Sequence, residues 1–199
     1  FMWMGSRNGL NRYDGYKFLI YRCDPKNGNS ISNNMITDLV EDRHGNIWIA
    51  TQNGLNRYER NKGTFIRYMH DDKNPNSISN NVINRLTFDL DGNLWIGTQD
   101  GGLDCFDVKK KIFRHHLHSG ANANSIADNN VRAVFEDSQH NLWVGTAFAG
   151  LSIYNKISNT CSKFPDKDPV TKTIVGNNVT CIIENNKDQL WIGTQEDGL

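Results

Sequence analysis

The sequence lacks long hydrophobic runs, an excess of charge of either sign, and segments with helical periodicity. No apolar run approaches the ~20 residues that a membrane-spanning helix needs. Lys and Arg number 22 and Asp and Glu number 22, so the net charge is zero. A neutral chain has no overall attraction to nucleic-acid phosphates. The short apolar runs disfavour all-α and doubly wound α/β folds.

Recognisable catalytic motifs are also missing. The sequence contains no Gly-x-Ser-x-Gly, Cys-x-x-Cys, His-Glu-x-x-His or phosphate-loop pattern. Residues 89–93 faintly resemble a calcium loop but lack its bidentate glutamate. We therefore expect no catalytic residue, no bound metal and no cofactor, and we expect the chain itself not to be an enzyme.

The sequence has four cysteines, Cys23, Cys105, Cys161 and Cys181, and their sequence contexts differ, so they do not repeat. Four cysteines allow three disulfide connectivities, and sequence alone leaves the pairing open. Isolated buried thiols are the favoured interpretation.

A regular repeat is what the sequence does have. Tryptophans recur every 45 to 48 residues, at Trp3, Trp48, Trp95, Trp143 and Trp191. Gly-Leu pairs keep the same period, beginning at Gly9, Gly54, Gly102, Gly150 and Gly198. Periods of this size indicate a repeat architecture.

One repeat unit predicts four short strands joined by polar turns. After a polar loop at 29–34, the predicted strands are 35–41, 47–51, 55–59 and 64–70. A four-stranded meander of this length is typical of a β-propeller blade. We predict an all-β propeller of four-stranded antiparallel blades, with units at 1–28, 29–75, 76–123, 124–171 and 172–199. The strand count is three, then three full units, then two, which is a partial arc of about four blades.

The repeated residues have structural explanations. Each tryptophan is expected to fill the space between adjacent blades, and the small residue two positions later, such as Gly97, leaves room for a neighbouring side chain. The carboxylates Asp42, Asp89 and Asp137 are expected to hold the backbone of hairpin turns, with Gly45 and Gly92 at positive φ.

The segment from Asp89 to Thr98, followed by Gly102-Leu103, resembles the repeat of two-component regulator propellers. The resemblance covers the whole chain. It implies the periplasmic sensor region of a Bacteroides-type hybrid two-component protein, whose parent is anchored in the inner membrane and carries histidine kinase parts elsewhere. It also implies a ligand among glycan breakdown products.

A closed propeller of this family would need roughly seven blades and ~330 residues. The chain starts within one predicted blade and stops at Gly198-Leu199, so we expect a piece of a larger sensor domain. The expected partners are the remaining blades of the parent, a second copy of the chain, and an oligosaccharide or other small ligand. We expect no nucleic acid and no direct membrane contact.

Candidate binding residues lie where one repeat departs from the others. The turns between second and third strands share one face of a propeller, and polar and aromatic groups there can bind a sugar. The predicted ligand-binding residues are Arg7, Gln52, Gln99, Asp100, Phe148 and Gln195. Ordinary solvated turns remain the alternative.

Three histidines form the one metal-like cluster. His115, His116 and His118 fall on a predicted outermost strand, with His116 and His118 on one face and His115 on the other. An exposed edge strand with polar side chains is the favoured interpretation. Two further functions stay open: a propeller lyase resembling streptogramin-inactivating enzymes, and a generic protein-interaction scaffold.

Overall fold

The computed structural model describes residues 1–164, 176–185, 189–196 and 198. These residues form seventeen β-strands and no helix, so none of the described segments could cross a membrane as a helix. The unit boundary expected between residues 171 and 172 lies outside the described residues, as does Leu199.

The strands form five antiparallel sheets, each a meander in chain order, which we call blades 1 to 5. Blade 1 contains β1 (Met2–Ser6), β2 (Gly9–Tyr13) and β3 (Phe18–Tyr21). Blade 2 contains β4 (Ile36–Glu41), β5 (Ile47–Thr51), β6 (Gly54–Glu59) and β7 (Thr64–Tyr68). Blade 3 contains β8 (Ile83–Phe88), β9 (Leu94–Thr98), β10 (Leu103–Asp107) and β11 (Ile112–His116). Blade 4 contains β12 (Val131–Glu136), β13 (Leu142–Thr146), β14 (Leu151–Asn155) and β15 (Thr160–Lys163), and blade 5 contains β16 (Val179–Glu184) and β17 (Leu190–Thr194).

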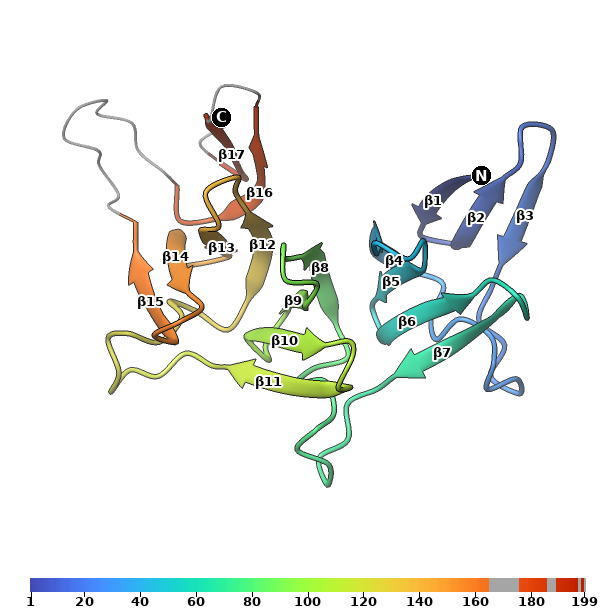
Figure 1. Cartoon of the computed structure of the whole chain (residues 1–199), viewed down its shortest axis with the longest axis horizontal. Helices are drawn as coiled ribbons and strands as arrows, with labels where there is room; N and C mark the ends of the chain where they lie inside the picture. Colours follow the sequence, from blue (N-terminus) through green and yellow to red (C-terminus); the bar gives the residue numbers. More distant parts are fainter. Residues whose placement is uncertain (165–175, 186–188, 197, 199) are drawn as a thin grey trace.

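The blades follow one another around an arc (Figure 1), with β4, β8, β12 and β16 toward its centre and β7, β11 and β15 outermost. This confirms the predicted all-β propeller of four-stranded blades and its partial arc. Strand ends differ slightly from prediction. The strand expected to reach residue 70 ends at Tyr68, and the His70 ring lies 2.7 Å from the carbonyl oxygen of Ile78.

Tryptophans fill the space between blades, as predicted. Trp48, Trp95 and Trp143 are buried. The Trp48 ring packs edge-on against Phe106 of the next blade, with ring centroids 5.8 Å apart. Trp191, on the last described strand, is 49% exposed. Each complete blade therefore presents its tryptophan face to the blade that follows.

The small residue after each tryptophan allows the next blade to approach. A β-carbon added to Gly97 would lie 2.9 Å from Cγ1 of Val131, the first residue of β12. Carbon atoms do not pack that closely, so a side chain there would push the blades apart.

The hairpin carboxylates do more than hold their own turns. The Asp89 side chain accepts hydrogen bonds from the Asn93 backbone at 2.7 Å and from the Trp95 indole nitrogen at 2.9 Å. Asp42 and Asp137 hold Trp48 and Trp143 in the same way. The turn thus fixes the tryptophan that separates two blades, a link that the residue spacing alone did not reveal.

These hydrogen bonds also control ionisation. Burial raises the pKa of Asp89, but hydrogen bonds from Asn93 and Trp95 outweigh it, so its pKa lies below the ordinary value. Gly45 and Gly92 adopt positive φ, at +77° and +87°, as predicted. In the third copy a non-glycine residue, His140, takes the same conformation at +67°.

The loop before each blade is less polar than its sequence suggested. Ile31, Ile78 and Ile126 are almost completely buried, although each sits within an Asn-Ser-Ile loop. Ile78 belongs to the cluster around Trp48, and Ile126 to the cluster around Trp95. The loop isoleucine therefore closes the space between adjacent blades.

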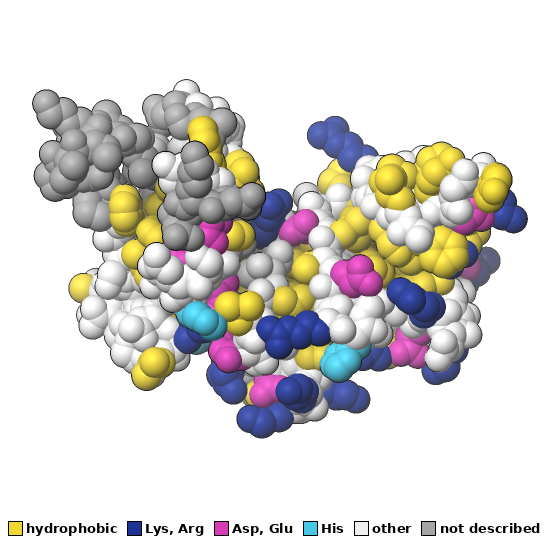
Figure 2. Space-filling view, turned by 45° about the horizontal axis from the view of Figure 1, so that its top comes forward, with side chains coloured by type: hydrophobic (Ala, Val, Ile, Leu, Met, Phe, Trp, Pro, Cys, Tyr) yellow, Lys and Arg dark blue, Asp and Glu magenta, His cyan; other side chains and the backbone are white. Residues whose placement is uncertain are grey.

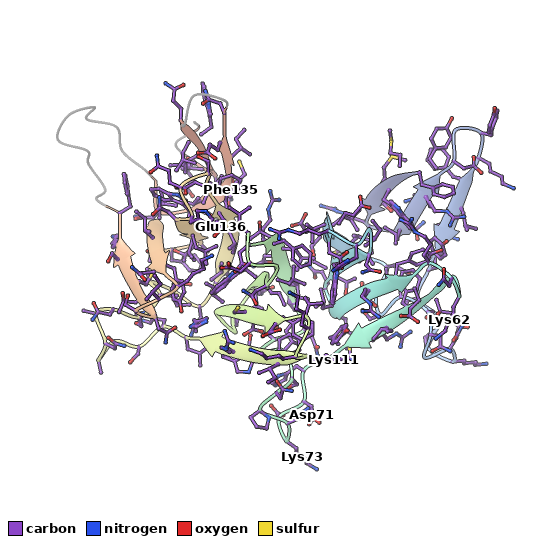
Figure 3. The ribbon with its side chains drawn as sticks, in the orientation of Figure 1. Lys62, Asp71, Lys73, Lys111, Phe135 and Glu136 are labelled. Atoms are coloured by element: carbon purple, nitrogen blue, oxygen red, sulfur yellow. The ribbon has the colours of Figure 1, made fainter. Side chains whose placement is uncertain are left out.

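Polar contacts tie blades together as well. Glu136 lies at the end of β12, where Figure 3 labels it. Its side chain accepts a hydrogen bond from the Leu90 backbone of blade 3 at 2.5 Å. The Lys156 ammonium lies 2.6 Å from Glu136 and 3.2 Å from Asp91. Glu184 repeats the backbone contact by accepting from Ser138 at 2.8 Å.

Candidate functional site

The turns between second and third strands have one shared construction. In blade 2, the Thr51 hydroxyl donates to the Gly54 carbonyl at 2.7 Å and accepts from the Asn53 amide at 3.0 Å. Thr98 and Thr146 form the equivalent pairs in blades 3 and 4. These hydrogen bonds from a side chain to the backbone fix the conformation of the turn.

These turns lie against the loops that precede the first strands. The Gln52 amide donates to the Met35 carbonyl at 3.1 Å, and the Gly54 amide donates to the Asn81 carbonyl of the next loop at 2.7 Å. The same two bonds recur around blades 3 and 4. Turns and loops therefore form one continuous surface, which we call the connection face.

All six predicted binding residues lie in the turns of the connection face. Arg7, Gln52, Gln99, Asp100 and Phe148 are exposed, and Phe148 is 69% exposed. Within the described chain, the side chains of Arg7, Gln52, Gln99 and Asp100 form no hydrogen bond. They are available to a ligand, and their binding role stays a prediction.

Gln195 differs, because its side chain belongs to a network. Its Oε1 accepts hydrogen bonds from Arg132 Nη1 at 2.8 Å and from Asn178 Nδ2 at 2.7 Å. Arg132 also donates to Asn178 Oδ1 at 2.8 Å, which joins β12 to the loop before blade 5. Gln195 is held in place by a charged partner that the turn sequence did not indicate.

Arg132 is the extra residue of a β-bulge, and the other innermost strands have a bulge at the same place. The pairing register shifts at equivalent places in β4, β8, β12 and β16, leaving Thr37, Asn84, Arg132 and Thr180 as the extra residues. Bulges are frequent beside functional sites because they redirect a side chain. Comparing the four copies at this position would have singled out Arg132, since the other three residues are uncharged.

A charged pair lies on the innermost strands of blades 2 and 3. Asp38 on β4 accepts from the Leu86 amide of blade 3 at 2.8 Å, and Arg85 Nε lies 3.6 Å from the same oxygen. Burial raises the pKa of Asp38 above its ordinary value, against the opposing effects of Leu86 and Arg85. A partly buried carboxylate with a raised pKa is a candidate functional group.

The three histidines have separate structural roles. His115 Nδ1 lies 2.7 Å from Asp104, and His118, beyond the end of β11, has Nδ1 2.9 Å from the Ile126 carbonyl. His116 stacks on Trp95 and is half-buried, and burial lowers its pKa to about 4. The expectation of an exposed polar edge strand is therefore wrong for His116, which packs like Tyr68 on Trp48.

Across the described part of the chain, no three His, Cys, Asp or Glu side chains are grouped to hold a metal. All four cysteines are free thiols. Cys105 and Cys161 are buried as expected and Cys23 is only half-buried, whereas Cys181 is exposed, so the expectation of burial is wrong there.

Comparison with known proteins agrees with this architecture. One curated relative, a histidine kinase P4 from Formosa agariphila, is 52% identical over 31 residues, covering 16% of this chain and 2% of that protein. The extracellular domain of a putative hybrid two-component system from B. thetaiotaomicron is similar in structure, with TM-score 0.61 and 22% identity, covering 98% of this chain and 31% of that one. Virginiamycin B lyase from Staphylococcus aureus has TM-score 0.66 and 17% identity, covering 96% of this chain and 58% of that chain.

This chain thus spans about a third of the two-component extracellular domain, and the likenesses at these identities concern the fold. The model of the two-component regulator propeller matches residues 30–53, 77–100, 125–148 and 173–196. The first three matches each run from a loop before a blade through the tryptophan strand into the turn that follows it. The repeat that packs these blades is the repeat of that family, and the chain belongs to the two-component regulator propellers.

Proposed function

We propose that this chain forms part of the ligand-sensing propeller of a hybrid two-component receptor that responds to glycan breakdown products. In this proposal the propeller lies in the periplasm, the parent is anchored in the inner membrane, and any kinase activity resides outside this chain. Family membership and the likeness to an extracellular two-component domain support it.

The observation that carries the proposal is that residues which differ between the repeats lie on the connection face. Aspartate, tryptophan and glycine positions are explained by blade packing. The departures Arg7 and Phe148 lie exposed on the connection face. Exposed guanidinium and aromatic groups on one surface suit a sugar, which needs both hydrogen bonds and a stacking plane.

Binding can be tested with a thermal-shift screen of the chain against an oligosaccharide panel. For any fragment that binds, we expect Arg7→Ala and Phe148→Ala each to weaken binding about tenfold, or ~1.4 kcal/mol. The melting temperature without ligand should hardly change, because both side chains are exposed. Arg60→Ala and Ile157→Ala are matched controls, since both residues lie in turns between third and fourth strands. Equal losses in the controls would contradict the assignment.

A propeller lyase is the alternative, supported by the structural likeness to virginiamycin B lyase. Such chemistry needs a general base on the connection face, and the described turns between second and third strands contain no histidine. Turnover of a cyclic lactone or of any glycan by the purified chain would favour the lyase over the sensor.

We also propose that apolar blade faces bind further blades of the parent or a second copy of the chain. Hydrophobic side chains gather over blade 1 (Figure 2), where Phe1, Met2 and Phe18 are 76%, 59% and 57% exposed. Contiguous apolar patches drive association. We expect light scattering of the purified chain to show concentration-dependent association, reduced by Phe18→Ser. A monomer at all concentrations that binds no hydrophobic dye would contradict this proposal.

A further inference from the structure

A pair of facing residues joins blade 2, and likewise blade 3, to the loop that precedes it. In blade 2, Asn56 on β6 lies opposite Arg67 on β7. Asn56 Oδ1 accepts from the Ser32 amide at 2.9 Å, and Arg67 Nε donates to the Ser30 carbonyl at 2.7 Å. The loop is thus held by one side-chain oxygen and one cation.

Blade 3 keeps this arrangement with different residues. Asp104 on β10, fully buried, lies opposite His115 on β11. One Asp104 oxygen accepts from the Ser79 amide at 2.8 Å, and the other lies 2.7 Å from His115 Nδ1. The hydrogen bond to Asp104 raises the pKa of His115. A buried carboxylate here joins the loop amide to the imidazole of His115 on the outermost strand.

Blade 4 has no such carboxylate or amide. Ser152 on β14 lies opposite Lys163 on β15, and Ala127 occupies the loop position of Ser32 and Ser79. Ser152 is 1% exposed, and its hydroxyl has no oxygen or nitrogen partner among the described residues. The neighbouring Cys161 thiol is only a weak partner. The Ala127 amide likewise forms no hydrogen bond within the described chain.

A cavity of about 350 Å³ lies at this position of blade 4. Ser152, Ala127 and Lys163 all line it, together with the apolar Ile126 and Cys161. Its volume falls within the range of small-molecule sites, about 300–1,000 Å³. The loop between β11 and β12 passes beside β15 (Figure 1), and the Cys161 amide donates to the Asn124 carbonyl at 2.7 Å, which holds the loop against the strand.

We propose that this cavity of blade 4 binds a small molecule through a carboxylate, which takes the place that the Asp104 side chain occupies in blade 3. The Ala127 amide and the Ser152 hydroxyl donate to the carboxylate oxygens, and the Lys163 side chain supplies positive charge at the rim. A buried hydroxyl without a partner destabilises the protein, so a ligand that pairs the Ser152 hydroxyl offsets that cost.

The cavity adjoins the connection face, because Ala149, next to Phe148, is also part of its lining. The inference names the chemical class of ligand for the proposed sensor, and its biological meaning rests on that function. Binding of a carboxylate depends only on the cavity, so the binding site and the sensor function can be contradicted by separate results.

The test measures binding of acetate, D-glucuronate and D-glucose to the chain by calorimetry and by amide chemical shifts. The two sugars differ only in a carboxylate at C6. We expect glucuronate to bind at least about tenfold more tightly than glucose, and acetate to shift the Ala127 amide signal. Equal affinity for the two sugars, or no binding of acetate and glucuronate, would overturn the proposal.

Two variants fill the cavity as neighbouring blades do: Ser152→Asn copies Asn56, and Ser152→Asp copies Asp104. Both should lower glucuronate affinity about tenfold or more and raise the melting temperature by pairing the Ala127 amide. Ser162→Asp adds the same charge on β15 outside the cavity and should leave affinity nearly unchanged. Retained affinity in the folded Ser152→Asn protein would place the ligand elsewhere and refute the site.

The outcomes also separate this inference from the proposed function. Glucuronate binding that depends on Ser152, in a chain that binds no oligosaccharide of the panel, supports the pocket and contradicts the glycan ligand. Oligosaccharide binding that depends on Arg7 and Phe148 but not on Ser152 supports the sensor and refutes the pocket.

Discussion

Trp95→Ala is expected to destabilise the chain by about 3–5 kcal/mol, because it removes a large buried side chain and leaves a cavity between two blades. Trp95 is 3% exposed and belongs to the cluster that contains Leu103, Val134 and Tyr154. The matched control is Trp191→Ala, whose side chain is 49% exposed and should cost much less. Denaturant unfolding followed by circular dichroism measures both. Equal losses for the two variants would contradict interblade packing as the source of stability.

The hydrogen bond of Trp95 can be separated from its packing. Trp95→Phe keeps most of the aromatic area but removes the indole donor to Asp89. The pKa of folded Asp89 lies below the ordinary 3.8. Its ionised form therefore adds stability that is fully present above pH 3.8 and is lost as pH falls through the lower folded pKa. Trp95→Phe should cost less than Trp95→Ala and flatten the decline of stability in acid. An unchanged acid profile would show that the indole contributes nothing to Asp89 ionisation.

Structural features that recur in every blade and need a particular residue type could be predicted from the sequence. The Trp48 and Trp95 spacing gave the blade period, and Gly92 gave a turn that needs positive φ. The hydrogen bond that the Trp95 indole donates to Asp89 was missed, because it depends on how the hairpin brings two side chains together across six positions. Ile78 looked like part of a polar loop because its burial depends on the neighbouring blade.

The candidate site was harder to predict, because it depends on differences between copies in three dimensions. Turn residues such as Phe148 could be placed on one face from topology alone. Arg132 could not, since only the bulge in β12 brings it to Gln195. The Ser152 cavity needed the strand register as well, because Ser152, Asn56 and Asp104 are recognised as equivalent by what lies opposite each of them.

Gly145→Ala is expected to destabilise the chain by about 1–3 kcal/mol, although it adds a single methyl group. A β-carbon at Gly145 would lie 2.5 Å from Cγ1 of Val179 and 3.0 Å from Cβ of Ala133. Val179 is completely buried on β16, so the added carbon must push blade 5 away from blade 4. Gly28→Ala is the matched control, because nothing lies within 4 Å of a β-carbon there. It should be neutral or slightly stabilising, since alanine restricts the unfolded chain.

A second substitution shows whether the clash with Val179 is the cause. Val179→Ala alone should also destabilise the chain, because it leaves a cavity at a buried position. The double variant Gly145→Ala/Val179→Ala removes the contact with Cγ1 of Val179 and leaves the contact with its Cβ, at 2.8 Å, so the clash is reduced. The loss in the double variant should therefore be smaller than the sum of the two single losses, by about 0.5–3 kcal/mol for residues in contact. Additive losses in denaturant unfolding would contradict direct contact, and the spacing between blades 4 and 5 would then depend on residues other than Gly145.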